Sequence, residues 1–307
     1  MTVGYGAYTK PLAMEHTGRE ECRMRMGIVM TGAGAHAAAA VGVLDALFER
    51  GIEPYAVCGV LGGAWPAALY AAGMDVEAMY AALLHAGRSG RRLISSGASA
   101  RALARGNAWA CLNAERMERL LALQTGQRML SLCPRAAVFP CRMMRSGYPV
   151  VFSTRSYAQE SGVMLSMQAS LSFAARTALM PPPLFPAMRW MGSVILPLAD
   201  EALACRQLLA MGAQRVLVVA PQLSPRTEPD ALDLAAAGMT PGSDARTLPQ
   251  AAVLRVPIDD GITALAIEKL PACAQSGRRA AEREMDECLN RMGMASGRVL
   301  PFRRIRA

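Results

Sequence analysis

A glycine-framed turn is the stretch of this sequence best suited to covalent chemistry. Residues 59–63 are Gly-Val-Leu-Gly-Gly, and they follow a short apolar run that predicts a β-strand. A Gly-x-Ser-x-Gly turn between a strand and a helix exposes a serine hydroxyl as a nucleophile, and its glycines let the backbone turn tightly. Here the central position is Leu61, whose side chain has no nucleophilic atom. The sequence therefore predicts the backbone of a nucleophile turn without its reactive group, over Gly59, Val60, Leu61, Gly62 and Gly63.

A second glycine-rich stretch precedes this turn. It follows an apolar strand predicted over 26–30 and opens a helix predicted over 37–50, which Gly51 ends. Backbone N–H groups at a helix N-terminus can hold an oxyanion or a phosphate. We therefore expect an oxyanion-binding loop made of Gly32, Ala33, Gly34, Ala35, His36 and Ala37.

The order of these parts resembles that of the patatin-like phospholipase family, in its bacterial type. That family has a Gly-Gly-Gly-x-Arg-Gly loop, a helix close to Gly-Val-Leu-x-Ala-Leu, and then Gly-x-Ser-x-Gly. Residues 42–47 are Gly-Val-Leu-Asp-Ala-Leu, 64–73 resemble the helix after the turn, and 146–153 resemble a hairpin that precedes the catalytic acid. The resemblance spans roughly residues 26–220. It implies a three-layer α/β fold, with a mainly parallel central sheet covered by helices on both faces.

The same resemblance implies that the catalytic pair is lost. The family's second catalytic residue is an aspartate in Asp-Gly-Gly or Asp-Gly-Ala, and the corresponding residues are Met191, Gly192 and Ser193. Leu61 thus stands in place of the serine, Met191 in place of the aspartate, and His36 in place of the arginine. Loss of the nucleophile of a hydrolase costs about six powers of ten in rate. We therefore expect no intact catalytic residue and no hydrolysis by the family's dyad.

A displaced nucleophile is the alternative. Cys58 lies shortly before the turn, and a thiol becomes a strong nucleophile when a neighbouring base or charge lowers its pKa. His36 on the adjacent loop could supply that base. However, cysteine is usually buried as a small hydrophobe, and position 58 is expected within a strand. His36 is expected instead to be a polar spacer or a helix cap, and Asp200 and Glu201 to be helix N-terminal charges.

The predicted organisation is one domain with extensions. Residues 1–25 form an N-terminal extension, and 26–220 form the patatin-like domain. A proline-rich loop spans 221–252, a strand and a covering helix packed on the same domain span 253–293, and a basic tail spans 294–307. Hydrophobic residues make up 52% of the chain and charged residues 19%, which is enough apolar material for a well-filled core.

The spacing of the cysteines and histidines predicts a protein without a metal or cofactor. Together with the N-terminal sequence, it also predicts a cytoplasmic location. The eight cysteines include no Cys-x-x-Cys, and the histidines have no metal-ligand spacing. No secretory signal pattern is found at the N-terminus. The uncharged stretch 54–74 has the length of a membrane span, but four glycines and Pro66 divide it into strand, turn and helix.

The net charge of +9 leaves two interpretations of the arginines open. One is a peripheral contact with an anionic membrane, and the other is a plain solvated surface. No motif for sequence-specific nucleic-acid binding is present. The leading hypothesis is a non-catalytic protein that binds a lipid or fatty-acyl chain or regulates a protein partner; the alternative is a lipid acyl hydrolase using Cys58. The arginines in question are Arg88, Arg91, Arg92, Arg101 and Arg105.

Overall fold

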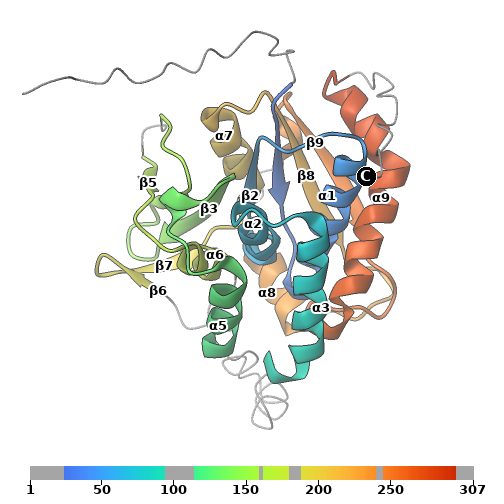
Figure 1. Cartoon of the computed structure of the whole chain (residues 1–307), viewed down its shortest axis with the longest axis horizontal. Coiled ribbons are helices and arrows are strands. Elements are labelled where there is room, and N and C mark those ends of the chain that lie inside the picture. Colours follow the sequence, from blue (N-terminus) through green and yellow to red (C-terminus); the bar gives the residue numbers. More distant parts are fainter. Residues whose placement is uncertain (1–23, 94–113, 159–161, 180–187, 240–244, 295–307) are drawn as a thin grey trace, which may run out of the picture.

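A mixed sheet of nine strands lies at the centre of the computed structural model, which describes residues 24–93, 114–158, 162–179, 188–239 and 245–294 (Figure 1). The strand order is β5-β4-β3-β2-β1-β8-β9, and the β6–β7 hairpin joins the sheet through β3. The five parallel strands are β3 (Ala136–Met143), β2 (Ala56–Gly59), β1 (Met26–Met30), β8 (Arg215–Gln222) and β9 (Ala251–Pro257).

The remaining strands extend the sheet beyond β3. β4 and β7 both pair antiparallel with β3, β5 runs parallel to β4, and β6 pairs antiparallel with β7. This end of the sheet is therefore built from hairpins, whereas the other end is built from strand–helix–strand units. The four strands are β4 (Pro149–Ser153), β5 (Met164–Ser166), β6 (Met188–Trp190) and β7 (Ser193–Pro197).

Helices cover both faces of the sheet, which confirms the predicted three-layer architecture. On one side lie α1 (Ala39–Glu49), α2 (Ala64–Ala71) and α9 (Leu270–Arg291), and on the other lies α7 (Glu201–Met211) (Figure 1). Further helices are α3 (Val76–Leu93), α5 (Ala114–Thr125), α6 (Leu171–Leu179) and α8 (Ala231–Met239), with 3-10 turns η1 (Gly34–Ala38), η2 (Leu61–Gly63), η4 (Leu130–Leu132), η5 (Ala245–Thr247) and η6 (Ile267–Lys269).

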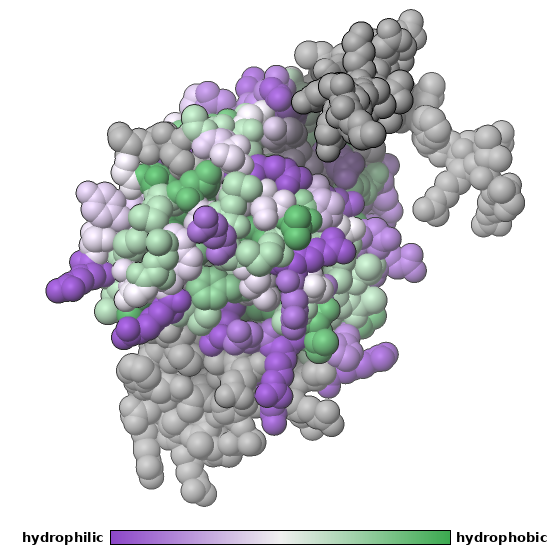
Figure 2. Space-filling view, turned by 60° about the vertical axis from the view of Figure 1, so that its left-hand side comes forward, coloured by the Kyte–Doolittle hydropathy of each residue, from purple (hydrophilic) through white to green (hydrophobic). Residues whose placement is uncertain are grey.

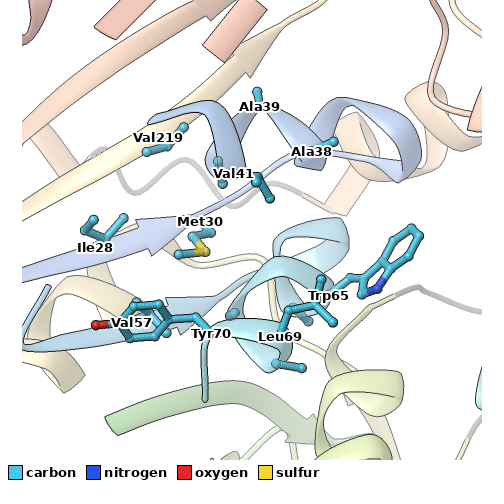
Figure 3. Packing of buried hydrophobic residues seen from close by; sticks show 14 of the residues in the cluster. Ile28, Met30, Ala38, Ala39, Val41, Val57, Trp65, Leu69, Tyr70 and Val219 are labelled. Atoms are coloured by element: carbon cyan, nitrogen blue, oxygen red, sulfur yellow. The ribbon is translucent and has the colours of Figure 1, made fainter. Parts of the chain in front are cut away.

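Strand β1 divides the core into two layers. Ile28 and Met30 belong to the cluster under α1 and α2, and Figure 3 shows Met30 between side chains of these two helices. Val29 points to the other face and joins the cluster under α7. All three side chains are fully buried. This alternation on a strand buried on both faces explains why the sequence of β1 is continuously apolar.

Two helices begin at an aspartate whose side chain caps the first turn. The Asp200 carboxylate accepts a hydrogen bond from the Leu203 N–H at the start of α7, and Gly212 ends that helix in the left-handed conformation. Asp75 caps α3 in the same way, through the Ala78 N–H at 2.8 Å.

The prediction of a loop over 221–252 is wrong in part, because residues 231–239 form helix α8. Among the described helices, none is both long and apolar enough to cross a membrane.

Helices α1 and α9 pack so closely that their backbones touch. A Cβ atom on Gly277 of α9 would overlap the carbonyl oxygen of Ala39, and one on Gly42 of α1 would overlap the carbonyl oxygen of Ala274. The absent side chains therefore set the separation of these two helices. Because α1 follows the glycine-rich loop directly, this contact also fixes where that loop begins its helix.

We predict that Gly277→Ala lowers the free energy of unfolding by about 3 kcal/mol, because the two helix backbones must separate. The matched control is Gly238→Ala in α8, where an added Cβ meets no atom within 4 Å. The control should leave stability unchanged or raise it by up to about 1 kcal/mol. Urea unfolding followed by circular dichroism measures both; equal effects of the two substitutions would contradict the close packing of α1 on α9.

Candidate functional site

The turn after β2 has the strained backbone of a nucleophile turn. Val60 is extended, and Leu61 follows with φ of 51°, in the left-handed region. A non-glycine residue in that region is strained, by about 1–2 kcal/mol. The chain then enters η2 and α2, so the predicted strand–turn–helix order is found.

Two glycines allow this turn to lie in direct contact with the glycine-rich loop and with the end of β1. A Cβ on Gly62 would lie 2.6 Å from the Gly32 oxygen and 3.0 Å from the Gly34 nitrogen. A Cβ on Gly63 would overlap the Met30 carbonyl at the end of β1. The two glycine-rich stretches found in the sequence therefore meet at the carboxyl edge of the parallel strands.

The glycine-rich loop keeps backbone donors at this edge. Gly32 and Gly34 both have positive φ, at 113° and 45°. The Ala35 N–H donates to the Ala264 carbonyl at 2.8 Å. No acceptor within the described part of the chain is paired with the N–H groups of Gly32, Ala33 or Gly62. Such N–H groups suit the carbonyl oxygen of an ester or the oxygens of a carboxylate.

The Leu61 side chain fills the tip of the turn with hydrocarbon. It is 7% exposed and belongs to the apolar cluster between the sheet and α7. Since leucine carries no lone pair or acidic proton, this position cannot attack a carbonyl. The site retains donors for an oxygen and lacks the atom that would form an acyl-enzyme.

Met191 lies in a different environment from Leu61. It is 77% exposed at the two-residue turn between β6 and β7, where Met191 and Gly192 have φ of 48° and 77°. Positive φ at both central positions defines the hairpin turn that favours Asn-Gly or Asp-Gly. An aspartate at 191 would therefore suit the turn better than methionine does. Assignment of the acid position to Met191, with Gly192 and Ser193, stays a prediction.

Cys58 is poorly suited to act as a displaced nucleophile. It lies in β2 between Val29 and Val138, and it is fully buried. Burial raises the pKa of the Cys58 thiol well above its ordinary value, and the neighbouring Cys205 and Cys141 raise it further. A buried thiol of this kind is neither ionised nor accessible to an ester, which argues against the alternative based on Cys58.

His36 is a buried anchor, which corrects the expectation of a polar spacer or cap. Its Nε2 atom lies 3.0 Å from the Ile262 carbonyl oxygen, and its Nδ1 atom lies 3.4 Å from Asp233 Oδ1. The two side chains are 5% and 8% exposed. The imidazole thus faces α8 and the loop after β9. Asp233 escaped the sequence analysis because it lies within the segment expected to be a loop.

Asp233 belongs to a larger network that fastens this loop. Its Oδ2 atom accepts from the N–H groups of Asp230 and Ala264, at 3.1 and 3.2 Å. Asp230 in turn accepts from the Leu265 N–H at 2.6 Å. Burial raises the pKa of Asp233 above its ordinary value of 3.8, while these N–H groups and His36 oppose that shift. The network holds the back of the glycine-rich loop, so its role is positional.

The other candidate residues and groups lie elsewhere or outside the described residues. Arg88 is exposed on α3. The side chains of Arg91 and Arg92, and all of Arg101 and Arg105, lie outside the described residues, as does the basic tail from 295. Within the described ranges, no group of three or more histidine, cysteine, aspartate or glutamate side chains could hold a metal ion.

Comparison with known proteins identifies the domain. The family model described as Patatin-like phospholipase matches residues 28–193, which is more than half of the chain. That range begins in β1 and ends at the first residue of β7, and so includes both glycine-rich stretches. Among curated proteins, none matches the sequence significantly.

Solved structures similar to this chain come from bacteria and human. They include VipD from Legionella pneumophila (12% identity, TM-score 0.47, 86% of this chain and 67% of that one). Full-length ExoU with SpcU from Pseudomonas aeruginosa has 18% identity and a TM-score of 0.40, covering 88% and 53%. Human GIVD cytosolic phospholipase A2 in complex with methyl gamma-linolenyl fluorophosphonate has 13% identity and a TM-score of 0.43, covering 88% and 60%.

We predict that Asp233→Ala lowers the free energy of unfolding by about 2–4 kcal/mol at neutral pH, because it leaves His36 and two buried N–H groups without their acceptor. The control, Asp260→Ala, removes an exposed carboxylate that lies 3.5 Å from Arg226, and should cost less than about 1 kcal/mol. Chemical denaturation measures both.

The pH dependence tests the protonation of Asp233 separately. A carboxyl group whose pKa is raised by folding adds stability below its unfolded pKa and loses that contribution as the pH rises through its folded pKa. The stability difference between wild type and Asp233→Asn should therefore move in favour of the variant as the pH rises above about 4. A difference that stays constant above about pH 4, and moves in favour of the wild type as the pH rises toward 4, would show that the folded pKa is lowered instead.

Proposed function

The chain belongs to the patatin-like phospholipase family, and we propose that it is a member that binds an acyl lipid without hydrolysing it. The observation that carries this proposal is Leu61 at the tip of an otherwise retained nucleophile turn. The turn has the backbone geometry that would present a serine, and presents hydrocarbon in its place. In this proposal the turn supports binding of a ligand but not its hydrolysis, because residue 61 carries no nucleophile.

The donors that remain favour a ligand with an oxygen at the end of an apolar chain. The N–H groups of Gly32, Ala33 and Gly62 have no acceptor among the described residues, and Leu61 lies beside Gly62. A fatty-acid carboxylate carries two acceptor oxygens, and an acyl ester carries one carbonyl oxygen. Both place hydrocarbon next to those oxygens, where the Leu61 side chain can contact it. We take the free carboxylate as the better match, since oriented N–H groups at a helix N-terminus favour negative charge.

Hydrolysis by other groups receives little support. Without its nucleophile, a hydrolase retains only the rate enhancement due to its donors and to substrate binding, roughly 10³–10⁴ over water. Cys58 is buried, with a raised pKa. His36 is buried, and its two ring nitrogens contact the Ile262 carbonyl and the Asp233 carboxylate. The proposed function therefore assigns no general base to this chain.

We predict that the wild-type protein neither hydrolyses p-nitrophenyl esters above background nor reacts with a fluorophosphonate probe. Leu61→Ser supplies a hydroxyl that can displace fluoride from the probe and form a phosphorus–oxygen bond at residue 61. We expect Leu61→Ser/Met191→Asp to react faster than Leu61→Ser if Met191 occupies the acid position. Intact-mass and peptide mass spectrometry detect the adduct.

Two controls make this result interpretable. Leu61→Ala removes the leucine without adding a nucleophile, so it should stay unlabelled. Cys58→Ala should change nothing. Wild-type turnover that disappears in Cys58→Ala would overturn the proposal and establish a displaced nucleophile.

We further predict that the purified protein binds a long-chain fatty acid and that Leu61→Asp weakens this binding at least tenfold. The new carboxylate would lie beside the same N–H groups and repel the ligand's charge. Leu61→Asn has nearly the same shape without the charge, and should bind more tightly than Leu61→Asp. Displacement of a fluorescent fatty acid measures affinity. Equal affinities of the two variants would place the ligand elsewhere, and absence of binding in wild type would favour a protein-partner role.

A further inference from the structure

Two hairpin tips lie side by side at the outer end of the sheet. Strands β3 and β4 turn at 144–148, and β6 and β7 turn at 191–192. The Met144 N–H donates to the Val194 carbonyl at 2.9 Å, directly beyond the β3–β7 register that pairs Met143 with Ile195. The β6–β7 hairpin stands out from the body on the left of Figure 1. Together these tips form one projecting surface.

This hairpin surface exposes large apolar side chains. Met191 is 77% exposed, and Met144 and Tyr148 are each 59% exposed. Met164, at the start of β5 opposite Val150, adds a further 43%-exposed side chain near the same end. Exposing several large apolar side chains together is unfavourable in water and typically marks an interaction site. Methionine and tyrosine at the tips of convex hairpins can insert into a soft apolar phase.

The same surface carries positive charge that is not paired with an acid among the described residues. Arg142, Arg145 and Arg189 are exposed, and no aspartate or glutamate occurs in 136–153 or 188–199. Nowhere in the described ranges does one of these guanidinium groups form an ion pair. Elsewhere the pattern differs, since Arg278 contacts Asp45, Glu49 and Glu282 within 3.0 Å. Figure 2, with this side turned forward, shows long hydrophilic side chains projecting among apolar ones.

We infer that this hairpin surface docks the protein on an anionic lipid membrane. Its apolar tips would enter the boundary between headgroups and acyl chains, and its arginines would contact lipid phosphates. The surface projects and carries one sign of charge, which matches a fluid negative plane better than a shaped protein groove. The interacting residues are Arg142, Met144, Arg145, Tyr148, Arg189 and Met191. None of these residues belongs to the arginine-rich segment over 88–105.

The hairpin surface lies at a defined edge of the sheet, so docking through it would orient the protein on the membrane. β3 runs parallel to β2 and pairs with it only up to Val138 opposite Cys58. It then continues to Met143, past the edge at which β2 ends at Gly59. The hairpin surface therefore extends from the same carboxyl edge that holds Leu61. Docking itself does not depend on whether that edge binds an acyl chain.

Vesicle binding tests the inference. The full-length protein is mixed with phosphatidylcholine vesicles, with or without phosphatidylserine, and bound protein is measured by flotation. We expect binding that requires phosphatidylserine and weakens with added salt. Arg142→Gln/Arg145→Gln/Arg189→Gln should reduce the partition coefficient roughly a hundredfold, as three contacts with an anionic surface predict. Met144→Ser/Tyr148→Ser should reduce it at least tenfold.

A matched control separates this surface from general hydrophobicity. Leu123→Ser/Leu132→Ser removes side chains that are 82% and 73% exposed on α5 and η4, and should bind vesicles as wild type does. Circular dichroism and urea midpoints confirm that each variant is folded. Brominated lipids should also quench the tryptophan fluorescence of the bound protein, because Trp190 adjoins the tip. The quenched part of the signal should be absent in Trp190→Phe.

If both hairpin variants bind vesicles as strongly as the wild type does, the inference is overturned. The membrane would then be contacted by another part of the chain, such as residues 88–105 or the basic tail. Absence of wild-type binding to anionic vesicles would also overturn it and leave a protein partner as the occupant. Fatty-acid displacement in the absence of vesicles should be unchanged in the arginine variant and in Met144→Ser/Tyr148→Ser. Failure of docking is therefore distinguishable from failure of the proposed acyl-lipid binding.

Discussion

The carboxyl edge of the sheet depends on direct contact between backbones at glycine positions. Gly63 lies against the end of β1, and Gly62 lies against the glycine-rich loop, with no room for a Cβ atom at either place. This contact fixes the distance between the turn after β2 and the loop after β1. Because the constraint is steric, it holds whatever side chain occupies position 61. That explains how the strained turn can form with a leucine at this position.

The glycine-rich loop is also held from its other side. A Cβ atom on Gly34 would overlap the Ala264 carbonyl, and the Ala35 N–H donates to that same oxygen. His36 and Asp233 extend this attachment to α8 through buried hydrogen bonds. The loop is thus fixed between the turn and the segment after β9. Such double support keeps N–H groups oriented without help from catalytic side chains, and pre-organised donors are what make a binding site for an oxygen effective.

Local patterns predicted the parts of the fold whose causes are local. The apolar sequence of β1, the place of Asp200 at the start of α7, and the glycines around Leu61 each follow from a short-range rule. Helix α8 escaped prediction because prolines dominate the segment around it. Asp233 lies in that same segment, and its partners His36 and Ala264 are brought to it only by the tertiary fold. The exposure of Met191 was equally hidden, since a motif match gives no depth of burial.

Leu61 changes which state of a ligand this edge can stabilise. In a hydrolase the N–H donors favour the transition state over the substrate, because negative charge develops on the carbonyl oxygen only when the nucleophile attacks. Without an attacking atom that charge never develops, so an ester gains only a neutral hydrogen bond. A carboxylate already carries the charge and gains the full interaction as a bound ground state. In the function proposed for this chain, the same donors would therefore retain a free fatty acid where a hydrolase would use them to cleave an ester.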